Sequence, residues 1–478
     1  MLSGNNFVVA KDITVSTGNE LQQVITNATE PIKIQFANDI NDIDISSLKT
    51  IPIGANAIEI DGEGKKLINE KDSKFTFVKN SSLALKNLKY EGKNASININ
   101  DVDAIISLEN VNISGRTTAN YPDGSALFLK GCDATLNNVS VFSSRVETNR
   151  SISGGIINIQ SAKSRGIITN LIDNQITSTG TLTGGLIYNR RTLTPVGELS
   201  LSDNVKENKI NAKSYINGGV LNNEGSSIQS INWNEVNNNT ITSSENSIQG
   251  GLIYNKSGTI DSLKINSLSG NTISSNFSIN GGLIYNQSGT IKELQIDSLV
   301  DNIIHSNSPI NGALIYNGNG TIEGELKIGQ IERNIITATG FNGLITNSSG
   351  NINSISIDSV SDNDITMNTM LGGVIKLLGA NVKDITIGKI NNNEIIGNEN
   401  SSAIGFILYS IESPISSNIE NLNVGQIHEN SVTATNITSL LFRSALEHAN
   451  VISKNGNITV DDIRDNSLVA VDCDDNAR

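Results

Sequence analysis

Histidines and paired carboxylates are the side chains of this sequence whose types could support catalysis or metal binding. The three histidines, His305, His428 and His448, stand alone, and none forms a His-x-x-x-His or Cys-His cluster, although zinc needs clustered ligands. The acidic pairs Asp461-Asp462 and Asp474-Asp475 suggest calcium or glycoside hydrolysis, but hydrolysis requires two carboxylates held across a sugar in a cleft. We expect solvated turn residues at these positions, and therefore no catalytic site, no metal site and no cofactor.

Four tyrosines share one position of a repeated block: Tyr188, Tyr254, Tyr285 and Tyr316. Strand alternation directs the preceding residue, such as Ile187, into the core, so the tyrosines should point outward and stack in the consecutive coils. Exposed aromatic rings favour contacts with glycans and proteins, and the four tyrosines are the candidate binding residues. Stacked cross-strand aromatics also stabilise a sheet without any ligand, so both interpretations stay open.

A block that recurs about every 31 residues positions these tyrosines. Gly-Gly-Leu-Ile-Tyr-Asn begins at Gly184, Gly250 and Gly281, and a close copy begins at Gly312. A unit that repeats at one period cannot bury its apolar face alone and must stack on its neighbours. The chain is therefore expected to be a solenoid.

Each repeat contains three short apolar runs separated by turn residues, as in Leu252–Tyr254, Leu263–Ile265 and Thr272–Ser274. The period of two in such runs predicts strands with one buried face. A leucine-rich repeat is the competing architecture, but it returns through a helical segment, whereas the Gly-Gly, β-branched and Ser/Asn residues here disfavour helix. We predict an all-β parallel β-helix, or β-solenoid, with coils of about 31 residues.

An asparagine marker followed two residues later by Ile, Val or Leu keeps the same period. The markers are Asn174, Asn208, Asn239, Asn271, Asn302, Asn334, Asn363, Asn393, Asn430 and Asn466. Asparagine tolerates left-handed backbone and can bond its own backbone. The markers are therefore expected to have a structural role in a tight turn of each coil.

The two ends of the chain differ from the regular repeats. Apolar residues at Leu21, Val24, Ile25 and Ala28 have the spacing of an amphipathic helix, which would cap the open end of a solenoid. Residues 1–150 are expected to form this cap and irregular coils, and residues 151–478 the regular repeats continuous with them. Coil-like sequence persists to within ten residues of Arg478, so we expect either that the chain is cut short here or that a following region closes the stack.

Composition narrows the classes of partner. The net charge is −14, with 34 basic and 48 acidic residues, which disfavours binding to nucleic acid or to anionic membranes. Two cysteines give no disulfide framework, and no apolar run reaches the length of a transmembrane helix. The first residues lack the basic and apolar regions of a signal peptide, so an exported protein would be represented here by a trimmed form.

The helix-capped start, the segment Ile58–Gly64 and the repeated blocks with Ser-Gly-Thr-Ile at Ser257–Ile260 and Ser288–Ile291 together resemble bacterial type V autotransporter passengers. They are most similar to the polymorphic outer-membrane-protein and AIDA-like adhesins, although the alanine of the family's Gly-Gly-Ala-Ile is mostly Leu or Val here. This resemblance implies a right-handed parallel β-helix of the pectin lyase kind, secreted and displayed at the outer membrane. It also implies a non-enzymatic role in cell adhesion or self-association, with a glycan or protein of a host or bacterial cell surface, or a second copy, as the partner.

Two other classes of β-helix compete with the adhesin. A polysaccharide-degrading enzyme or a tailspike-like glycan-binding protein would require acidic and basic side chains clustered on one face of adjacent coils, and the sequence shows none. An ice-binding solenoid would require Thr-x-Thr in every coil, whereas threonines are scattered here.

Overall fold

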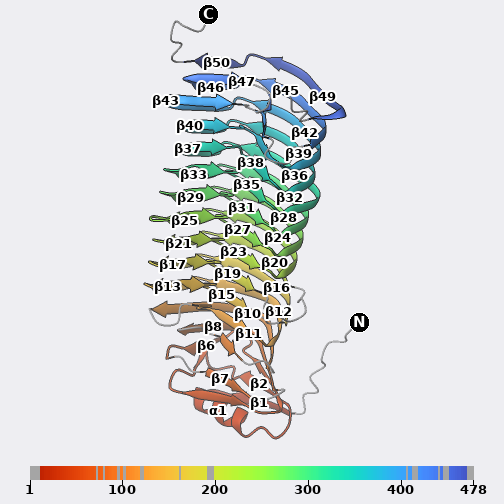
Figure 1. The fold of residues 1–478 in the computed structure, drawn as a ribbon. Helices are drawn as coiled ribbons and strands as arrows, with labels where there is room; N and C mark the ends of the chain where they lie inside the picture. The colour runs from red at the N-terminus through yellow and green to blue at the C-terminus, as the bar shows by residue number, and fades with distance from the viewer. Residues whose placement is uncertain are drawn as a thin grey trace, which may run out of the picture.

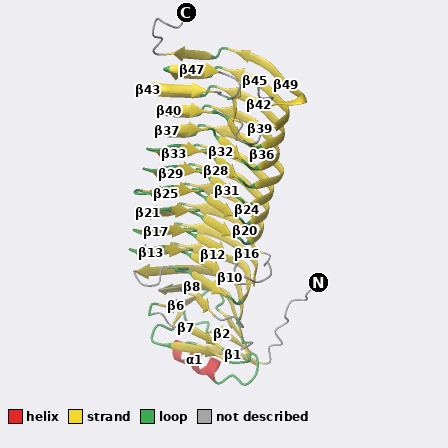
Figure 2. Ribbon diagram, viewed as in Figure 1, coloured by secondary structure: helices red, strands yellow, loops and turns green. Residues whose placement is uncertain are grey.

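The chain forms a rod of stacked coils in the computed structural model, with a helix at one end (Figure 1). The structure describes residues 11–71, 74–78, 81–93, 97–100, 104–118, 123–160, 163–190, 199–404, 407–411, 418–439, 442–444 and 452–470. Parallel strands stack as a β-solenoid of about 11 turns with about 30 residues per coil. The predicted all-β parallel β-helix is therefore confirmed, and Figure 2 shows strands nearly throughout.

One central coil illustrates the repeat. It runs through β30 (Ile279–Asn280), β31 (Ile284–Gln287), β32 (Thr290–Val300) and β33 (Ile303–Ser306). Every strand pairs in parallel with the equivalent strand of the next coil. The last three correspond to the three runs predicted from the sequence, whereas the two-residue strand was not predicted because it is too short to show a period.

The remaining elements follow the same order. The capped end contains β1 (Lys11–Val15), α1 (Gly18–Thr26), β2 (Ile32–Phe36), β3 (Asp42–Asp44), β4 (Thr50–Ile53), β5 (Ala57–Asp61), β6 (Lys66–Asn69) and β7 (Lys74–Phe77). The long strands are β8 (Ser82–Lys93), β10 (Ile105–Thr118), β12 (Asp133–Phe142), β16 (Lys163–Ile172), β20 (Leu199–Lys206), β24 (Ser227–Asn237), β28 (Thr259–Ser269), β36 (Thr321–Glu332), β39 (Asn351–Ser361), β42 (Asn381–Asn391), β45 (Asn418–His428) and β49 (Ile452–Arg464). We call the strands that follow the long strands the side strands. They are β33 and β13 (Arg145–Thr148), β17 (Gln175–Ser178), β21 (Lys209–Ala212), β25 (Thr240–Ser243), β29 (Thr272–Ser275), β37 (Ile335–Asn342), β40 (Asp364–Leu371), β43 (Glu394–Ile404), β46 (Ser431–Ala434) and β50 (Ser467–Ala470).

Short strands complete each coil. Those equivalent to β30 are β14 (Ile152–Ser153), β18 (Leu182–Thr183), β22 (Ile216–Asn217), β26 (Ile248–Gln249) and β34 (Ile310–Asn311), with β47 (Asn436–Ser439) in a late coil. A separate 12-stranded sheet contains β31 together with β9 (Ile97–Asn100), β11 (Leu127–Lys130), β15 (Ile157–Gln160), β19 (Ile187–Arg190), β23 (Leu221–Glu224), β27 (Ile253–Lys256), β35 (Ile315–Gly318), β38 (Ile345–Ser348), β41 (Ile375–Leu378), β44 (Leu408–Ile411) and β48 (Phe442–Ser444).

A ladder of aliphatic side chains fills the core behind this 12-stranded sheet. Ile284 pairs with Ile253 in one neighbouring coil and with Ile315 in the other, and all three are at most 1% exposed. Ile187 and Ile345 occupy the same buried position further along the rod. The prediction that the residue before each tyrosine lies in the core is thus confirmed. Burial of each such side chain contributes about 1.5–3 kcal/mol to stability.

The asparagine markers form a second buried ladder inside the coil. The Nδ2 of Asn271 donates to the Oδ1 of Asn302 at 3.0 Å, and the backbone N–H of Asn271 donates to the same oxygen at 3.1 Å. The expected structural role is confirmed, but the left-handed backbone lies one residue earlier, as at Gly270 (φ 64°) and Arg333 (φ 52°). The marker needs its side chain inside the coil to reach its neighbours, so the preceding, outward residue makes the turn.

The predicted helix is confirmed as α1, with its N-cap at Thr17. The Thr17 Oγ1 accepts the backbone N–H of Glu20 at 3.2 Å, and the Glu20 carboxylate accepts the N–H of Ser16 at 2.7 Å. Leu21 and Ile25 are buried against the first coils. Because α1 covers this end, it protects apolar core that an open solenoid would expose.

Candidate functional site

The predicted tyrosines occupy one column of the 12-stranded sheet, which we call the tyrosine column. Tyr254, Tyr285 and Tyr316 follow one another in consecutive coils. The ring centroids of Tyr254 and Tyr285 are 5.2 Å apart with an interplanar angle of 23°, and those of Tyr285 and Tyr316 are 4.7 Å apart at 14°. Tyr188 is separated from this stack because Asn222 occupies the position between it and Tyr254. The predicted stacking is therefore confirmed for three of the four.

The expectation that these rings are exposed is wrong. Tyr188 is 4% exposed, and Tyr254 and Tyr285 are each 6% exposed, while Tyr316 is half-buried. Two features bury the column. Each stacked ring covers the face of its neighbour, and the Gly-Gly corner packs so closely that a Cβ on Gly281 would lie 2.8 Å from the Tyr285 Cβ. The outward direction was predicted correctly, but alternation along a strand does not reveal what covers the outer face.

The buried tyrosine hydroxyls act as hydrogen-bond donors. The Tyr188 hydroxyl donates to a Glu224 carboxylate oxygen at 2.7 Å, and the Lys256 Nζ donates to the other oxygen at 3.1 Å. The Tyr254 hydroxyl donates to the Gln287 side chain. Burial, and then the hydrogen bond to Glu224, raise the pKa of Tyr188 above its usual value, while burial raises the pKa of Tyr254 to about 12. Both hydroxyls therefore stay protonated at neutral pH.

A second column, which the sequence did not reveal, lies beside the tyrosines on the short strands and, at Asn342, on the end of β37. We call it the amide column; it comprises Asn217, Gln249, Asn280, Asn311 and Asn342, and every side chain is half-buried. The Asn280 Nδ2 donates to the Gln249 Oε1 at 3.0 Å, the Asn311 Nδ2 to the Asn280 Oδ1 at 2.7 Å, and the Asn342 Nδ2 to the Asn311 Oδ1 at 2.6 Å. The signal was present, because Asn or Gln immediately precedes the Gly at the start of these repeats.

Hydrogen bonds join the two columns into one surface. The Asn222 Nδ2, at a tyrosine position, donates to the Asn217 carbonyl at 3.3 Å. The Lys376 Nζ, also at a tyrosine position, donates to the Asn342 Oδ1 at 2.5 Å. Burial lowers the pKa of Lys376 to about 8. We call the combined surface of the tyrosine and amide columns the corner strip.

The corner strip offers the same polar groups in successive coils. A primary amide has two N–H donors and an oxygen with two lone pairs, and the ladder bond uses one donor and one lone pair of each inner amide. The remaining donor and lone pair of Asn280 and of Asn311 can bond an external ligand. Such groups recur at the strand spacing of about 4.8 Å, which suits a ligand with repeated hydroxyl or amide groups.

The other sequence candidates lie apart from the corner strip. His305 lies half-buried on the side strand β33, and the His428 Nε2 lies 3.0 Å from an Asp462 carboxylate oxygen that also lies 3.2 Å from the Arg464 Nε. His448 and Asp474-Asp475 fall outside the described residues. Within the part of the chain that the structure describes, no group of three or more His, Cys, Asp or Glu side chains could hold a metal ion.

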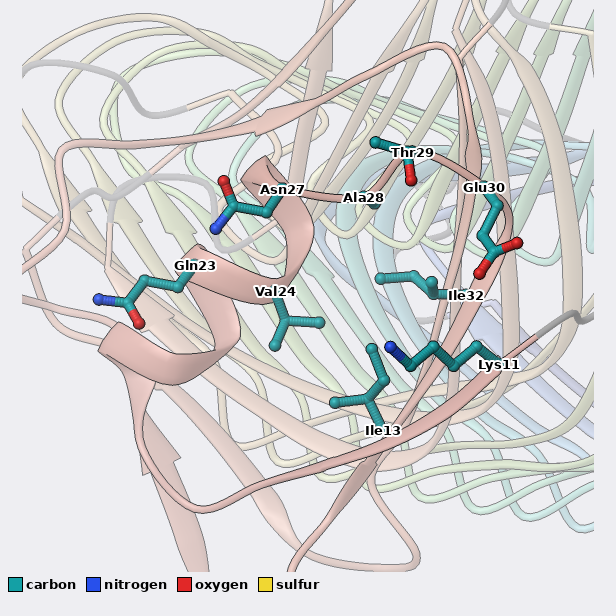
Figure 3. Close-up of a pocket in the computed structure, with 9 residues that line it drawn as sticks. All are labelled: Lys11, Ile13, Gln23, Val24, Asn27, Ala28, Thr29, Glu30 and Ile32. Carbon is teal, nitrogen blue, oxygen red and sulfur yellow. The ribbon is translucent and has the colours of Figure 1, made fainter.

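A cavity of about 320 Å³ lies at the capped end of the rod, between α1 and strands β1 and β2 (Figure 3). Apolar side chains from Ile13, Val24 and Ile32 line it together with the polar Gln23 and Glu30. In Figure 3 the side chains of Ile13, Val24 and Ile32 lie close together, from β1, α1 and β2, whereas Gln23 points away from them. Neither the tyrosine nor the amide column contributes to it.

Comparisons with known proteins give no relative for this chain: no family model, no curated protein and no solved structure matches it. Among the described residues, no helix is both long and apolar enough to cross a membrane.

Proposed function

We propose that this protein is a non-catalytic adhesive rod, secreted and displayed at a bacterial cell surface as the passenger of an outer-membrane autotransporter. Its ligand would be a polyhydroxylated glycan or a protein of a host or bacterial surface. The observation that carries the proposal is the corner strip, in which half-buried amides recur in consecutive coils beside stacked tyrosines.

The amide column would make the contacts, and the tyrosine column would support it. Because the amides are already bonded to each other, little side-chain freedom is lost when a ligand binds, which favours affinity. Only Tyr316 among the three stacked rings retains appreciable exposed surface. Tyr188, Tyr254 and Tyr285 would therefore act chiefly by holding the strip rigid.

Each coil contributes a weak contact, so affinity would come from several coils acting together. Linked weak contacts gain strength through effective concentration. The rod would bind weakly to a receptor that carries one short epitope. It would bind tightly to a polymer or to a cell surface that presents many epitopes.

A paired substitution tests the assignment of the ligand surface. Asn280→Ala combined with Asn311→Ala removes two consecutive amides of the strip. The matched control is Asn234→Ala combined with Asn266→Ala, which removes two exposed amides that are bonded to each other at 3.1 Å on the long strands. A glycan array first identifies the ligand, and binding of each variant to that glycan and to cells is then measured. The strip variant should lose at least about tenfold in apparent affinity and the control should keep it; equal loss in both would refute the assignment.

A further inference from the structure

The four asparagines of the amide column are each followed directly by glycine: Asn217, Asn280, Asn311 and Asn342. In an Asn-Gly step the backbone nitrogen of glycine can attack the side-chain amide carbon Cγ, because glycine has no Cβ to hinder the approach. The ring that forms is a five-membered imide, which water opens to aspartate or isoaspartate. The hydrogen bonds of each step decide whether this reaction occurs in the folded rod.

Three of the four steps are protected by the backbone ladder, because their glycine N–H donates to a carbonyl of the next coil. These bonds run from Gly218 to Gln249 at 2.8 Å, from Gly281 to Asn311 at 2.8 Å, and from Gly312 to Asn342 at 3.4 Å. A nitrogen held in this way can react only after the coil has opened locally, which costs free energy. These steps are therefore slow to cyclise while the rod is folded.

The fourth step, Asn342-Gly343, differs because its corner is one residue shorter. Asn342 pairs with Asn311 and Ile345 pairs with Ile315, so two residues separate the first pair from the second in this coil, against three in the coil before. Gly343 is consequently out of register with the next coil. Its N–H donates to no hydrogen-bond acceptor among the described residues, and the nitrogen is free to attack.

The surroundings of Gly343 also favour cyclisation. A Cβ on Gly343 would lie 3.0 Å from its nearest neighbour, the Ile345 carbonyl oxygen, whereas a Cβ on Gly312 would lie 2.2 Å from the equivalent oxygen. The corner is therefore more open. The Thr346 hydroxyl donates to the Asn342 carbonyl, which belongs to the same peptide group as the Gly343 nitrogen. Because such a bond draws electrons from the peptide group, it makes the Gly343 N–H more acidic.

Lys376 activates the side chain that is attacked. Its Nζ donates to the Asn342 Oδ1 at 2.5 Å. Burial lowers the pKa of Lys376 to about 8, so the ammonium form still predominates at neutral pH. Attack on Cγ moves negative charge onto Oδ1, and a cationic donor already aimed at that oxygen stabilises the transition state. The Oδ1 atoms of Asn280 and Asn311 accept neutral amides instead.

We propose that Asn342 is a self-modification site, which Lys376 activates and which converts to aspartate or isoaspartate in the folded rod. The Gly343 nitrogen bonds to Cγ, its proton passes through water to Nδ2, and the Cγ–Nδ2 bond breaks to release ammonia. Water then adds to the imide, and its proton goes to the ring nitrogen. Opening at Cγ gives aspartate, and opening at the backbone carbonyl gives isoaspartate. Asn342 is half-buried, so water can reach it.

The reaction would change one end of the corner strip. The Asn342 Nδ2 donates to the Asn311 Oδ1 at 2.6 Å, and a carboxylate cannot replace that donor. The new negative charge would pair with the Lys376 ammonium instead. The strip would lose the last bond of its amide column, and its affinity for a ligand would fall as the rod ages. This consequence rests on the proposed function, whereas the modification does not.

Peptide mapping by mass spectrometry tests the modification. The purified, folded chain is kept at neutral pH, and the conversion of each Asn-Gly step is followed with time. Asn342 should convert at least about tenfold faster than Asn217 or Asn280, because these two require local opening. In urea, where every glycine N–H is exposed to water, the three steps should react at similar rates. No conversion at Asn342, or equal rates at the three steps of the folded chain, would overturn the proposal.

Substitution of the lysine tests its role. A donor to a developing oxyanion contributes about 10²–10³-fold in closed enzyme sites, and this site is only half-buried, so Lys376→Met should slow conversion of Asn342 by at least about tenfold. Lys376→Arg keeps the positive charge and should keep most of the rate. Lys389→Met removes an exposed lysine of β42 and is the matched control. Circular dichroism checks that each variant is folded. An unchanged rate in Lys376→Met would overturn the assigned activation.

Two further measurements separate this proposal from other outcomes. Attack by the Lys376 Nζ itself would also release ammonia, but it would join the peptides that carry Asn342 and Lys376 in a link that hydroxylamine does not cleave, whereas hydroxylamine cleaves the imide. Finding that link would overturn the proposal. Binding of Asn342→Asp to the glycan is measured separately and should be weaker than that of the wild type. If neither this variant nor the Asn280 and Asn311 variant changes binding, the proposed function fails and the modification stands.

Discussion

Substitution of Asn302 by alanine should destabilise the rod far more than any exposed asparagine does. The Asn302 Oδ1 accepts the backbone N–H of Asn271 at 3.1 Å and the Asn271 Nδ2 at 3.0 Å. Its Nδ2 donates to the carbonyl of Leu268 at 3.0 Å and to the Oδ1 of Asn334 at 3.0 Å. Asn302 is fully buried, so water cannot replace these partners without entering the coil.

The magnitude follows from the groups that lose a partner. Leaving a buried donor or acceptor unsatisfied costs about 1–3 kcal/mol. The N–H of Asn271 and the carbonyl of Leu268 each lose a bond. The Asn271 Nδ2 keeps a bond of 2.8 Å to the carbonyl of Val236, and the Oδ1 of Asn334 keeps the backbone N–H of Asn302. The Val300 carbonyl, which accepts the Asn302 Nδ2 at 3.1 Å, keeps the N–H of Gly270 at 3.2 Å. Two losses predict a decrease of about 2–6 kcal/mol in the free energy of unfolding.

Urea denaturation followed by far-ultraviolet circular dichroism measures this change. The midpoint should fall with an unchanged dependence on urea, which would show that the folded state is the same. Asn307→Ala is the matched control, because Asn307 is exposed and donates to the Asn276 Oδ1 at 3.0 Å; it should change stability by less than about 0.5 kcal/mol. If the free energy of unfolding of Asn302→Ala also lay within about 0.5 kcal/mol of the wild-type value, the asparagine ladder would not stabilise the coils.

Three further predictions concern the other columns. Ile284→Asp should reduce the free energy of unfolding by several kcal/mol, on the order of other unpaired buried charges, and an unchanged melting temperature would contradict the inside-outside assignment at Ile284. Burial lowers the pKa of Lys376 to about 8, below its value of about 10.4 in the unfolded chain. Between these two pH values the unfolded chain binds more protons than the folded protein does. The free energy of unfolding should therefore rise as the pH rises through this range. Lys376→Met should lack this rise in urea titrations, and an identical pH profile in both proteins would show that Lys376 is not desolvated. Tyr285→Phe keeps the ring stack and should have a melting temperature close to that of the wild type. Tyr285→Ser should be destabilised by about 2–4 kcal/mol, because it leaves a cavity at a buried site between two rings. Equal stability of the two variants in thermal denaturation would show that the stack contributes nothing to stability.

The periodic features of this chain could be predicted from its sequence because each coil repeats one pattern of burial. The isoleucine ladder through Ile284, the cap formed by α1 and the stacking of Tyr254 on Tyr285 all follow from period, alternation and strand spacing. Features that depend on neighbouring segments could not be predicted in this way. The burial of Tyr285 depends on the Gly-Gly corner beside it, and the left-handed turn falls on Gly270 rather than on Asn271 because the asparagine side chain is needed inside.

The candidate site was only partly predictable for the same reason. The tyrosines are easily recognised in the sequence because the chain contains few aromatic residues. Asn280 and Asn311 are not, because the chain contains many other asparagines. Their importance appears only when register places Asn280 directly between Gln249 and Asn311.

The most direct test of the proposed non-catalytic adhesion is to incubate the purified chain with the glycan or cells that it binds, and to measure retained protein and released reducing ends in the same sample. The proposed function predicts that the protein is retained, more strongly on dense surfaces than on isolated epitopes, and that no sugar is released. Release of reducing ends that disappears on substitution of a single carboxylate would contradict it and would identify the rod as an enzyme.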